Sequence, residues 1–454
     1  MVVSHIAGNG QVQLRAKNLS SEGADLDAKG KLIALAENDM VLGTATRQTA
    51  YEEFHETKSG SVVASQTTKQ YDNKRELTHK GTELTGKGIV LQAGNDLNAE
   101  SVLAVSRNED VLLSAGNHVN LSTATNQQYE QHIKETKRSG FLNGGEIGFT
   151  IGSQKIRQEN TLDGAIQSTV RNTFASESSN VMVKAGHQAK ANNVDVMVAN
   201  DKSAVILGKN GVRVEAGKDV VHSTDKYEFS QSGLSLALST PVTNAMQSAH
   251  QSVQKAKATQ NDKLKGVYAV KAAEDAIIAA QNVSKVADTL GKLDNTLTEN
   301  TAATENPAMK IAVSVGSQKQ ERESQTETIT HAKSNLKGGN VSLISESGKV
   351  ELEGVDTKVK DTLHLEGKEG ILSKGVMDTT DNKTTDKNHS TSVGVFVGFT
   401  GDSYGMGVEA SGSVGKGKEN SHTESWQNNQ LHTDSCHFAY DNDCHCQYFH
   451  QRPH

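Results

Sequence analysis

The segments LQAGNDLNA (91–99) and LSAGNHVNL (113–121) repeat one short pattern within the chain. Their glycines, Gly94 and Gly116, lie 22 residues apart, and each is followed by apolar residues at alternate positions. Glycine and asparagine tolerate positive φ angles, and period-two apolar residues are typical of strands, so each unit predicts a turn followed by a strand. Two or more strands in a repeat of about 20 residues predict one coil of a parallel β-helix.

Variants of this unit occur elsewhere in the chain. They are AENDMVLG (36–43), VEAGKDVVH (214–222), GGNVSLIS (338–345) and GKVELEG (348–354). Stacked coils bury their Val, Leu and Ala side chains against the coils above and below. Asn95 and Asn117 occupy matching turn positions, where they either form a stacked amide ladder or act as ordinary turn residues. Both alternatives fit the same fold.

The composition favours a thin, elongated molecule. Only 34% of the 454 residues are hydrophobic and 40 are glycine, which leaves too few large side chains for a thick spherical core. The net charge of −7 is interspersed along the chain, which argues against a basic face for nucleic acid. No apolar run reaches the roughly 18 residues that a membrane helix needs. The opening residues MVVSHIAGNG do not resemble a signal peptide, so the chain alone is expected to remain cytoplasmic.

A second, longer pattern interrupts the coils. ETKSG (56–60) recurs as ETKRSG (135–140), each time at the end of a polar run. Glycine-punctuated alternating strands follow further along, as EIGFTIGSQK (146–155), LSLALST (234–240), IAVSVGSQK (311–319) and GVFVGFTGDSYGMGVEASGSVGK (394–416). The alternation predicts β-hairpins that project from the coil stack or cap it, with polar return strands facing water.

Residues 244–299 break the β pattern. This stretch is rich in alanine, and Val283, Val286, Leu290, Leu293 and Leu297 follow alternating steps of three and four. Such spacing is typical of an amphipathic helix, so we expect one helical hairpin inserted between two β arms. Its apolar face would pack on the coil stack or contact a partner or membrane, and we favour packing.

Taken together, these motifs resemble the filamentous haemagglutinin repeats of large bacterial two-partner secretion exoproteins. The resemblance rests on the AGNDLNA and SAGNHVN coils, the ETKSG and ETKRSG strands, the IGSQK and VGSQK hairpins and the NAMQSAHQSVQKAK helix. It covers residues 1–435 and is greatest to the later repeat region of contact-dependent growth inhibition exoproteins. The fold that it implies is a right-handed parallel β-helix.

The resemblance also implies a function. The chain would be a non-catalytic segment of a secreted, cell-surface exoprotein that helps deliver a C-terminal toxin into neighbouring bacteria. The implied partners are an outer-membrane transporter, a target-cell receptor and the target outer membrane, with no nucleic acid and no small-molecule substrate. Two alternatives stay open: an adhesin segment that attaches cells, and, more remotely, a β-helical carbohydrate-active enzyme.

The repeats divide the chain into expected regions. These are haemagglutinin-type repeats over 1–60, a second repeat unit over 61–140, a third unit with a hairpin over 141–243, the helical insert over 244–299, a fourth unit with a glycine-rich hairpin over 300–435, and a non-homologous, disordered tail over 436–454. We expect this copy to lack the secretion and toxin domains of the family.

Motifs that could carry chemistry are poorly formed. GSVGKGKE (412–419) has glutamate where a phosphate-binding loop needs Ser or Thr, and neither it nor GMGVEA (405–410) precedes a helix pattern. The tail offers only loosely spaced metal ligands: Cys436, His437, Cys444, His445, Cys446 and His450. Other acidic residues and histidines are scattered, namely Glu351, Glu353, Asp356, His55, His79, His118 and His364. We therefore predict no catalytic residue, no metal site and no cofactor.

Overall fold

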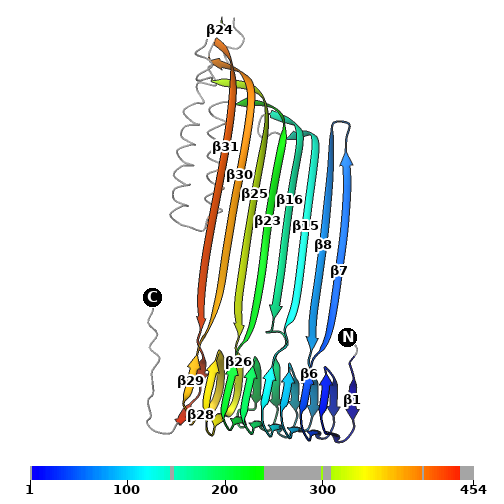
Figure 1. The fold of residues 1–454 in the computed structure, drawn as a ribbon, viewed down its shortest axis with the longest axis vertical. Coiled ribbons are helices and arrows are strands. Elements are labelled where there is room, and N and C mark those ends of the chain that lie inside the picture. The colour runs from blue at the N-terminus through cyan, green and yellow to red at the C-terminus, as the bar shows by residue number, and fades with distance from the viewer. Residues whose placement is uncertain (1–2, 144–147, 240–297, 300–307, 401–402, 440–454) are drawn as a thin grey trace.

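The computed structural model describes residues 3–143, 148–239, 298–299, 308–400 and 403–439. Over these residues the chain forms strands but no helix, in two parts: a stack of short-stranded coils and a tall sheet of long hairpins beside it (Figure 1). Equivalent strands of successive coils pair in parallel, whereas the hairpin strands pair antiparallel. The predicted all-β fold, a parallel β-helix with projecting hairpins, is confirmed.

Each of the first six coils contains three strands, one on each face of the stack. The first pair of coils is β1 (His5–Gly8), β2 (Val12–Ala16), β3 (Leu19–Glu22), β4 (Asp25–Ala28), β5 (Leu32–Ala36) and β6 (Met40–Gly43). The second pair is β9 (Glu83–Gly86), β10 (Ile89–Ala93), β11 (Leu97–Glu100), β12 (Leu103–Ser106), β13 (Val111–Ala115) and β14 (Val119–Ser122). The third pair is β17 (Asn172–Ser176), β18 (Val181–Ala185), β19 (Gln188–Asn192), β20 (Val194–Val198), β21 (Ser203–Gly208) and β22 (Gly211–Glu215).

In the fourth pair, two neighbouring strands of each coil merge into one. The first of these coils is β26 (Ser334–Ser345) with β27 (Lys349–Glu353), and the second is β28 (Val355–Gly367) with β29 (Ile371–Lys374). After the last hairpin, β32 (Gln430–His432) and β33 (Ser435–Ala439) pair with β28. The first half of β26 pairs with β20 and the second half with β21, so this strand joins two faces of the stack. Against β28 its register shifts between Gly338 and Asn340.

The core is a set of ladders that run along the stack. One ladder joins equivalent buried residues of successive coils: Val12, Leu32, Ile89, Val111, Val181, Ala204, Val341 and Leu363. Alternate residues of these short strands are buried and the others are not. Burying one such side chain contributes roughly 1.5–3 kcal/mol, and the contribution recurs in every coil. The narrow interior explains how the chain folds with so few large apolar residues.

Stacked turns require glycine at one position. A Cβ added to Gly94 would lie 1.9 Å from the carbonyl oxygen of Glu37, and one on Gly116 would lie 2.1 Å from that of Gly94. Asn95 and Asn117 follow these glycines, but their amides do not form a ladder with each other. Instead they donate to carboxylates of the preceding coil, at 2.7 Å to Asp39 Oδ1 and 2.9 Å to Asp96 Oδ1.

Within the described residues, four long hairpins leave the stack, one after every second coil. They are β7 (Ala45–Gly60) with β8 (Ala64–Lys80), β15 (Asn126–Asn143) with β16 (Gly148–Ile166), β23 (Gly217–Ser239) with β25 (Met309–Ala332), and β30 (Val376–Thr400) with β31 (Ser403–Gln427). Neighbouring hairpins pair through β8–β15, β16–β23 and β25–β30, so that all eight strands form one antiparallel sheet. The short β24 (Thr298–Glu299) adds to β31.

The coil stack and the hairpin sheet grow along the same direction with the same spacing (Figure 1). Paired strands lie about 4.8 Å apart in both, so two coils advance the stack by about 9.6 Å. A hairpin adds two strands to the sheet and advances it by the same amount. One hairpin for every two coils therefore keeps both parts in step.

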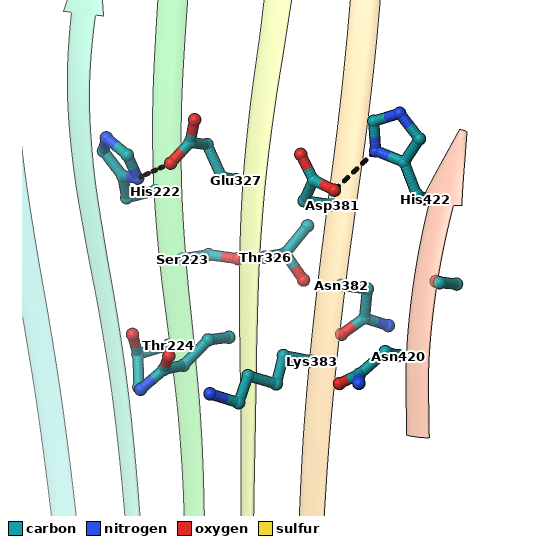
Figure 2. Close-up of a pocket in the computed structure, with 12 residues that line it drawn as sticks. His222, Ser223, Thr224, Thr326, Glu327, Asp381, Asn382, Lys383, Asn420 and His422 are labelled. Carbon is teal, nitrogen blue, oxygen red and sulfur yellow. Dashed lines mark hydrogen bonds and ion pairs between the residues drawn. The ribbon is translucent and has the colours of Figure 1, made fainter. Parts of the chain in front are cut away.

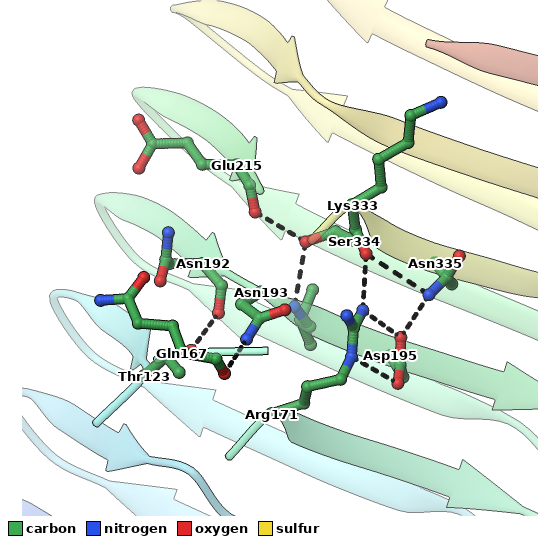
Figure 3. A network of polar contacts seen from close by, with 11 residues as sticks. Thr123, Gln167, Arg171, Asn192, Asn193, Asp195, Glu215, Lys333, Ser334 and Asn335 are labelled. Carbon is green, nitrogen blue, oxygen red and sulfur yellow. Dashed lines mark hydrogen bonds and ion pairs between the residues drawn. The ribbon is translucent and has the colours of Figure 1, made fainter. Parts of the chain in front are cut away.

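A polar network fixes the corner where hairpins return to the stack (Figure 3). Arg171, at the return from β16, donates to both carboxylate oxygens of Asp195 at 2.8 and 2.6 Å, and to the carbonyl of Lys333 at 2.6 Å. The hydroxyl of Ser334 accepts from the Val194 N–H at 2.9 Å and donates to the Glu215 carbonyl at 2.7 Å. The network thus ties the returns of two successive hairpins to the coil between them.

The structure departs from one sequence expectation and leaves most of another outside its described residues. The expected helical hairpin over 244–299 lies outside the described residues, except that Thr298 and Glu299 form β24. The tail was expected to leave the fold after Ser435, yet β33 continues the stack to Ala439, with Cys436 opposite Leu363 and Phe438 opposite Leu365. That part of the expectation is wrong, because residues 435–439 still alternate and pair with β28; residues 440–454 lie outside the described part. The expected region boundaries after residues 60 and 140 fall at the outer ends of hairpins.

The stacked glycine turns give a stability prediction. Gly116→Ala should destabilise the stack by about 1–3 kcal/mol, because the new methyl group meets the backbone of the preceding coil. Gly10→Ala is the matched control, since a Cβ there meets nothing within 4 Å. Urea denaturation followed by circular dichroism measures both. Equal midpoints for the two variants would contradict the packing described above.

Candidate functional site

The hairpin sheet has two faces of different chemistry. Residues directly opposite each other in antiparallel strands point to the same face, so the register sorts side chains into rows across the sheet. One row at the outer end contains Phe149, Leu236, Val313, Val395 and Val408, each opposite the next. We call the face that carries this row the apolar face.

Large exposed side chains cluster on the outer end of the apolar face. They form three neighbouring rows, here called the apolar zone: Phe141, Phe149, Ile151, Leu234, Ile311, Val313, Val315, Val393, Val395, Met406 and Val408. Between 38% and 75% of each side chain is exposed. Phe141 and Phe149 pack against each other with ring centroids 5.3 Å apart. Monomeric proteins rarely leave such a contiguous apolar surface open without a use for it.

A row of hydroxyl groups borders the apolar zone on the side toward the coils. Its members, here called the hydroxyl row, are Ser65, Ser139, Ser153, Ser232, Ser317 and Thr391. They pair across strands, with Ser65 and Ser139 oxygens 2.7 Å apart and those of Ser317 and Thr391 3.1 Å apart. The surface of this face therefore changes from apolar to polar between one row and the next.

The next row toward the coils is cationic. It contains Lys58, Lys137, Lys155 and Lys319, and we call it the lysine row. The four side chains are 40–74% exposed. Lys137, Lys155 and Lys319 and the five serines of the hydroxyl row are among the residues that line a shallow hollow of about 580 Å³. Its lining also includes Arg138, Gln154, Gln231 and Gln318.

Glutamates one row further from the apolar zone hold the lysines. Glu135 lies 3.2 Å from Lys137 Nζ and 2.9 Å from Lys155 Nζ. Burial alone would raise the pKa of Glu135, but the hydrogen bonds of Lys155 and Lys137 more than offset it, so that its pKa is lowered. The hydrogen bond with Glu321 raises the pKa of Lys319, and the hydrogen bond with Glu56 raises that of Lys58. These contacts favour the charged ammonium form of Lys319 and Lys58.

On the opposite face of the sheet, the residues next to the lysine row are mostly uncharged. Adjacent to the lysine row in sequence, and pointing the other way, are Gln66, Arg138, Gln154, Gln231 and Gln318. Apart from Arg138, whose Nε donates to Gln66 Oε1 at 2.8 Å, these side chains are uncharged amides. The lysine row and the apolar zone thus share one face.

Nearer the coils, histidines and carboxylates form one row across four strands. His222, Glu327, Asp381 and His422 lie opposite one another on β23, β25, β30 and β31 and line a hollow of about 570 Å³ (Figure 2). His222 Nδ1 lies 3.3 Å from Glu327, and His422 Nδ1 lies 2.6 Å from Asp381. Hydrogen bonds with Glu424 and then with Asp381 raise the pKa of His422.

The sequence candidates are dispersed in the structure. His55, His79 and His364 contact Thr57, Asn126 and Glu366 respectively, and His118 packs edge-on against His187. Glu351 and Glu353 both lie near Arg213, and Asp356 pairs with Lys333. GMGVEA and GSVGKGKE are parts of β31. Within the described ranges, no three His, Cys, Asp or Glu side chains are grouped to hold a metal, and no helix is long and apolar enough to cross a membrane.

Sequence reasoning missed the apolar zone and the lysine row, although a signal was present. KRSG (137–140) runs opposite GSQK (152–155), which runs opposite SQSG (230–233), which in turn runs opposite GSQK (316–319). These mirrored motifs mark one height on successive antiparallel strands. Their glycines stack as Gly140, Gly152, Gly233 and Gly316, where the strands approach closely.

Comparisons with known proteins agree with this architecture. A family model described as a hemagglutinin repeat matches residues 315–447. A tRNA nuclease CdiA of Yersinia mollaretii is 28% identical over 90% of this chain, and one of Escherichia coli (strain STEC_O31) is 30% identical over 89%. A 16S rRNA endonuclease CdiA of Enterobacter cloacae is 31% identical over 85%. The chain spans only 11–14% of the length of these relatives, and no solved structure matches it at a significant level.

The histidine row predicts a pH dependence. A pKa raised in the folded state means that the His422 contacts stabilise β30–β31 below the unfolded pKa of about 6.5, and that this is lost as the pH rises through the folded value. Amide exchange in β30–β31, corrected for intrinsic rates, should show more protection at pH 5.5 than at pH 8.5, and His422→Gln should remove the difference. His389→Gln on β30 is the control, since it has no ion pair among the described residues. A difference that survives His422→Gln would refute this assignment.

Proposed function

We propose that this chain, a haemagglutinin-repeat segment related to the CdiA exoproteins, is a rigid arm whose hairpin sheet contacts the outer membrane of a neighbouring bacterium during toxin delivery. The arm would belong to a cell-surface exoprotein of contact-dependent growth inhibition. The nuclease activities in the relatives' names belong to those longer proteins. Our proposal gives this segment no catalytic step, no metal and no cofactor.

The observation that carries the proposal is the apolar zone. It lies at the outer end of the hairpins, which is the end of the sheet farthest from the coil stack (Figure 1). Covering what remains exposed of each large side chain would contribute roughly 1 kcal/mol, so the zone as a whole supplies enough for membrane association. The lysine row on the same face matches the charge arrangement of surfaces that dock on bilayers.

The remaining partners are proposed from the resemblance to contact-dependent growth inhibition exoproteins. We propose an outer-membrane transporter for export and a target-cell receptor for recognition, with neither nucleic acid nor a small-molecule substrate bound by this segment. The coil stack would serve as a stiff support, because its ladders repeat the same burial in every coil. The hairpin sheet would then be held at a fixed distance and orientation.

A charge placed in the apolar zone should abolish membrane contact. Val395→Asp with Val408→Asp puts two carboxylates on opposed residues of β30 and β31, and binding of the full chain to phosphatidylcholine vesicles should fall about tenfold or more. Ser392→Asp with Ser411→Asp is the matched control: the same two strands and the same charges, on the opposite face. Vesicle cosedimentation measures both variants.

The control variant should bind vesicles like the wild type. Equal loss in both variants would point to unfolding of β30–β31, which circular dichroism detects. Unchanged binding by the apolar-zone variant, or no vesicle binding by the wild type, would refute membrane contact through this surface.

A further inference from the structure

The lysine row lies at a definite height below the apolar zone. Lys155 is four residues from Ile151 on β16, and Lys319 is four residues from Val315 on β25. At about 3.4 Å per residue, this places the lysine backbone about 14 Å from the edge of the zone. When an extended lysine side chain points toward the zone, its ammonium group lies at about half this distance from the edge of the zone. That distance is comparable with the thickness of a headgroup layer.

The charge on this face is arranged for an external anion. Lys137 and Lys155 share one glutamate, Glu135, and the glutamates lie on the side of the lysines away from the apolar zone. The opposite side is lined by the neutral hydroxyl row, whose Ser153 and Ser232 oxygens lie 3.2 Å apart and can donate to the same anion. The amide-rich opposite face offers no equivalent row of lysines at this height.

We propose that the lysine row and the hydroxyl row bind the phosphate groups of anionic lipid headgroups. This inference rests on the proposed function and deepens it: the apolar zone supplies insertion, and the lysine row selects a negatively charged surface and sets the depth. Lysines that contact Glu135 and Glu321 in the free chain turn toward phosphate at the bilayer. Each lysine near an anionic surface strengthens association severalfold, less what its glutamate contact already provides.

The test separates charge selection from insertion. The full chain is compared on neutral vesicles of phosphatidylcholine and on vesicles of phosphatidylcholine with phosphatidylglycerol at three to one. The wild type should bind the anionic vesicles more tightly. The triple variant K137Q/K155Q/K319Q should lose about tenfold in affinity for the anionic vesicles and keep its affinity for the neutral ones.

Three controls make the outcome specific. K337Q/K358Q/K360Q removes one exposed lysine of β26 and two of β28, in the coil stack and not in the hairpin sheet, and should change neither affinity. K137R/K155R/K319R should restore anionic binding if the triple glutamine variant fails for lack of charge rather than of fold. Inorganic phosphate at constant ionic strength should not displace the chain from anionic vesicles.

The outcomes are distinguishable. Equal loss on both vesicle types, or equal affinity of wild type and K137Q/K155Q/K319Q for anionic vesicles, overturns the lysine-row proposal and leaves insertion by the apolar zone standing. Displacement by inorganic phosphate overturns the lipid as ligand and assigns the row to free phosphate. Absence of binding to either vesicle type overturns the proposed function and this inference with it.

Discussion

The structure depends on one spacing, the roughly 4.8 Å between hydrogen-bonded strands. Coils stack at this spacing, and so do the strands of the hairpin sheet. A hairpin contributes two strands, so a sheet that stays attached to the stack needs two coils for each hairpin. The chain obeys this throughout its described length: β7–β8, β15–β16, β23–β25 and β30–β31 each follow two coils. Any other ratio would shear the hairpins away from each other or bend the stack.

This shared spacing creates the surfaces that we associate with function. Phe149 and Val408 are far apart in sequence, yet the register of five successive strands places them in one row. The apolar zone, the hydroxyl row and the lysine row each draw on three or more hairpins, and no single hairpin carries any of them. The corner network around Arg171 and Asp195 contributes to this by anchoring successive returns to one coil.

The sequence predicts the local architecture well because local features determine it. The turns at Gly94 and Gly116 and the alternation after them indicate coils, and the structure pairs these segments in register, Leu91 with Leu113. The faces of the hairpin sheet could not be predicted in the same way. Whether Ile151 and Leu234 point to the same side depends on the pairing of β16 with β23, which no local pattern reveals. The mirrored KRSG and GSQK motifs hold that information, but only once antiparallel neighbours are assumed.

A pair of deletions tests the spacing most directly. Glu83, Leu103 and Thr173 are equivalent positions in successive coils, so a chain lacking residues 83–102 loses one coil and a chain lacking 83–172 loses two coils with their hairpin. Hydrogen exchange should show β8 protected in the larger deletion, where β8 meets β23 at the correct height. In the smaller deletion β8 and β15 are brought one strand too close, and protection across their pairing should be lost. Protection of β8 that survives the one-coil deletion would contradict the account.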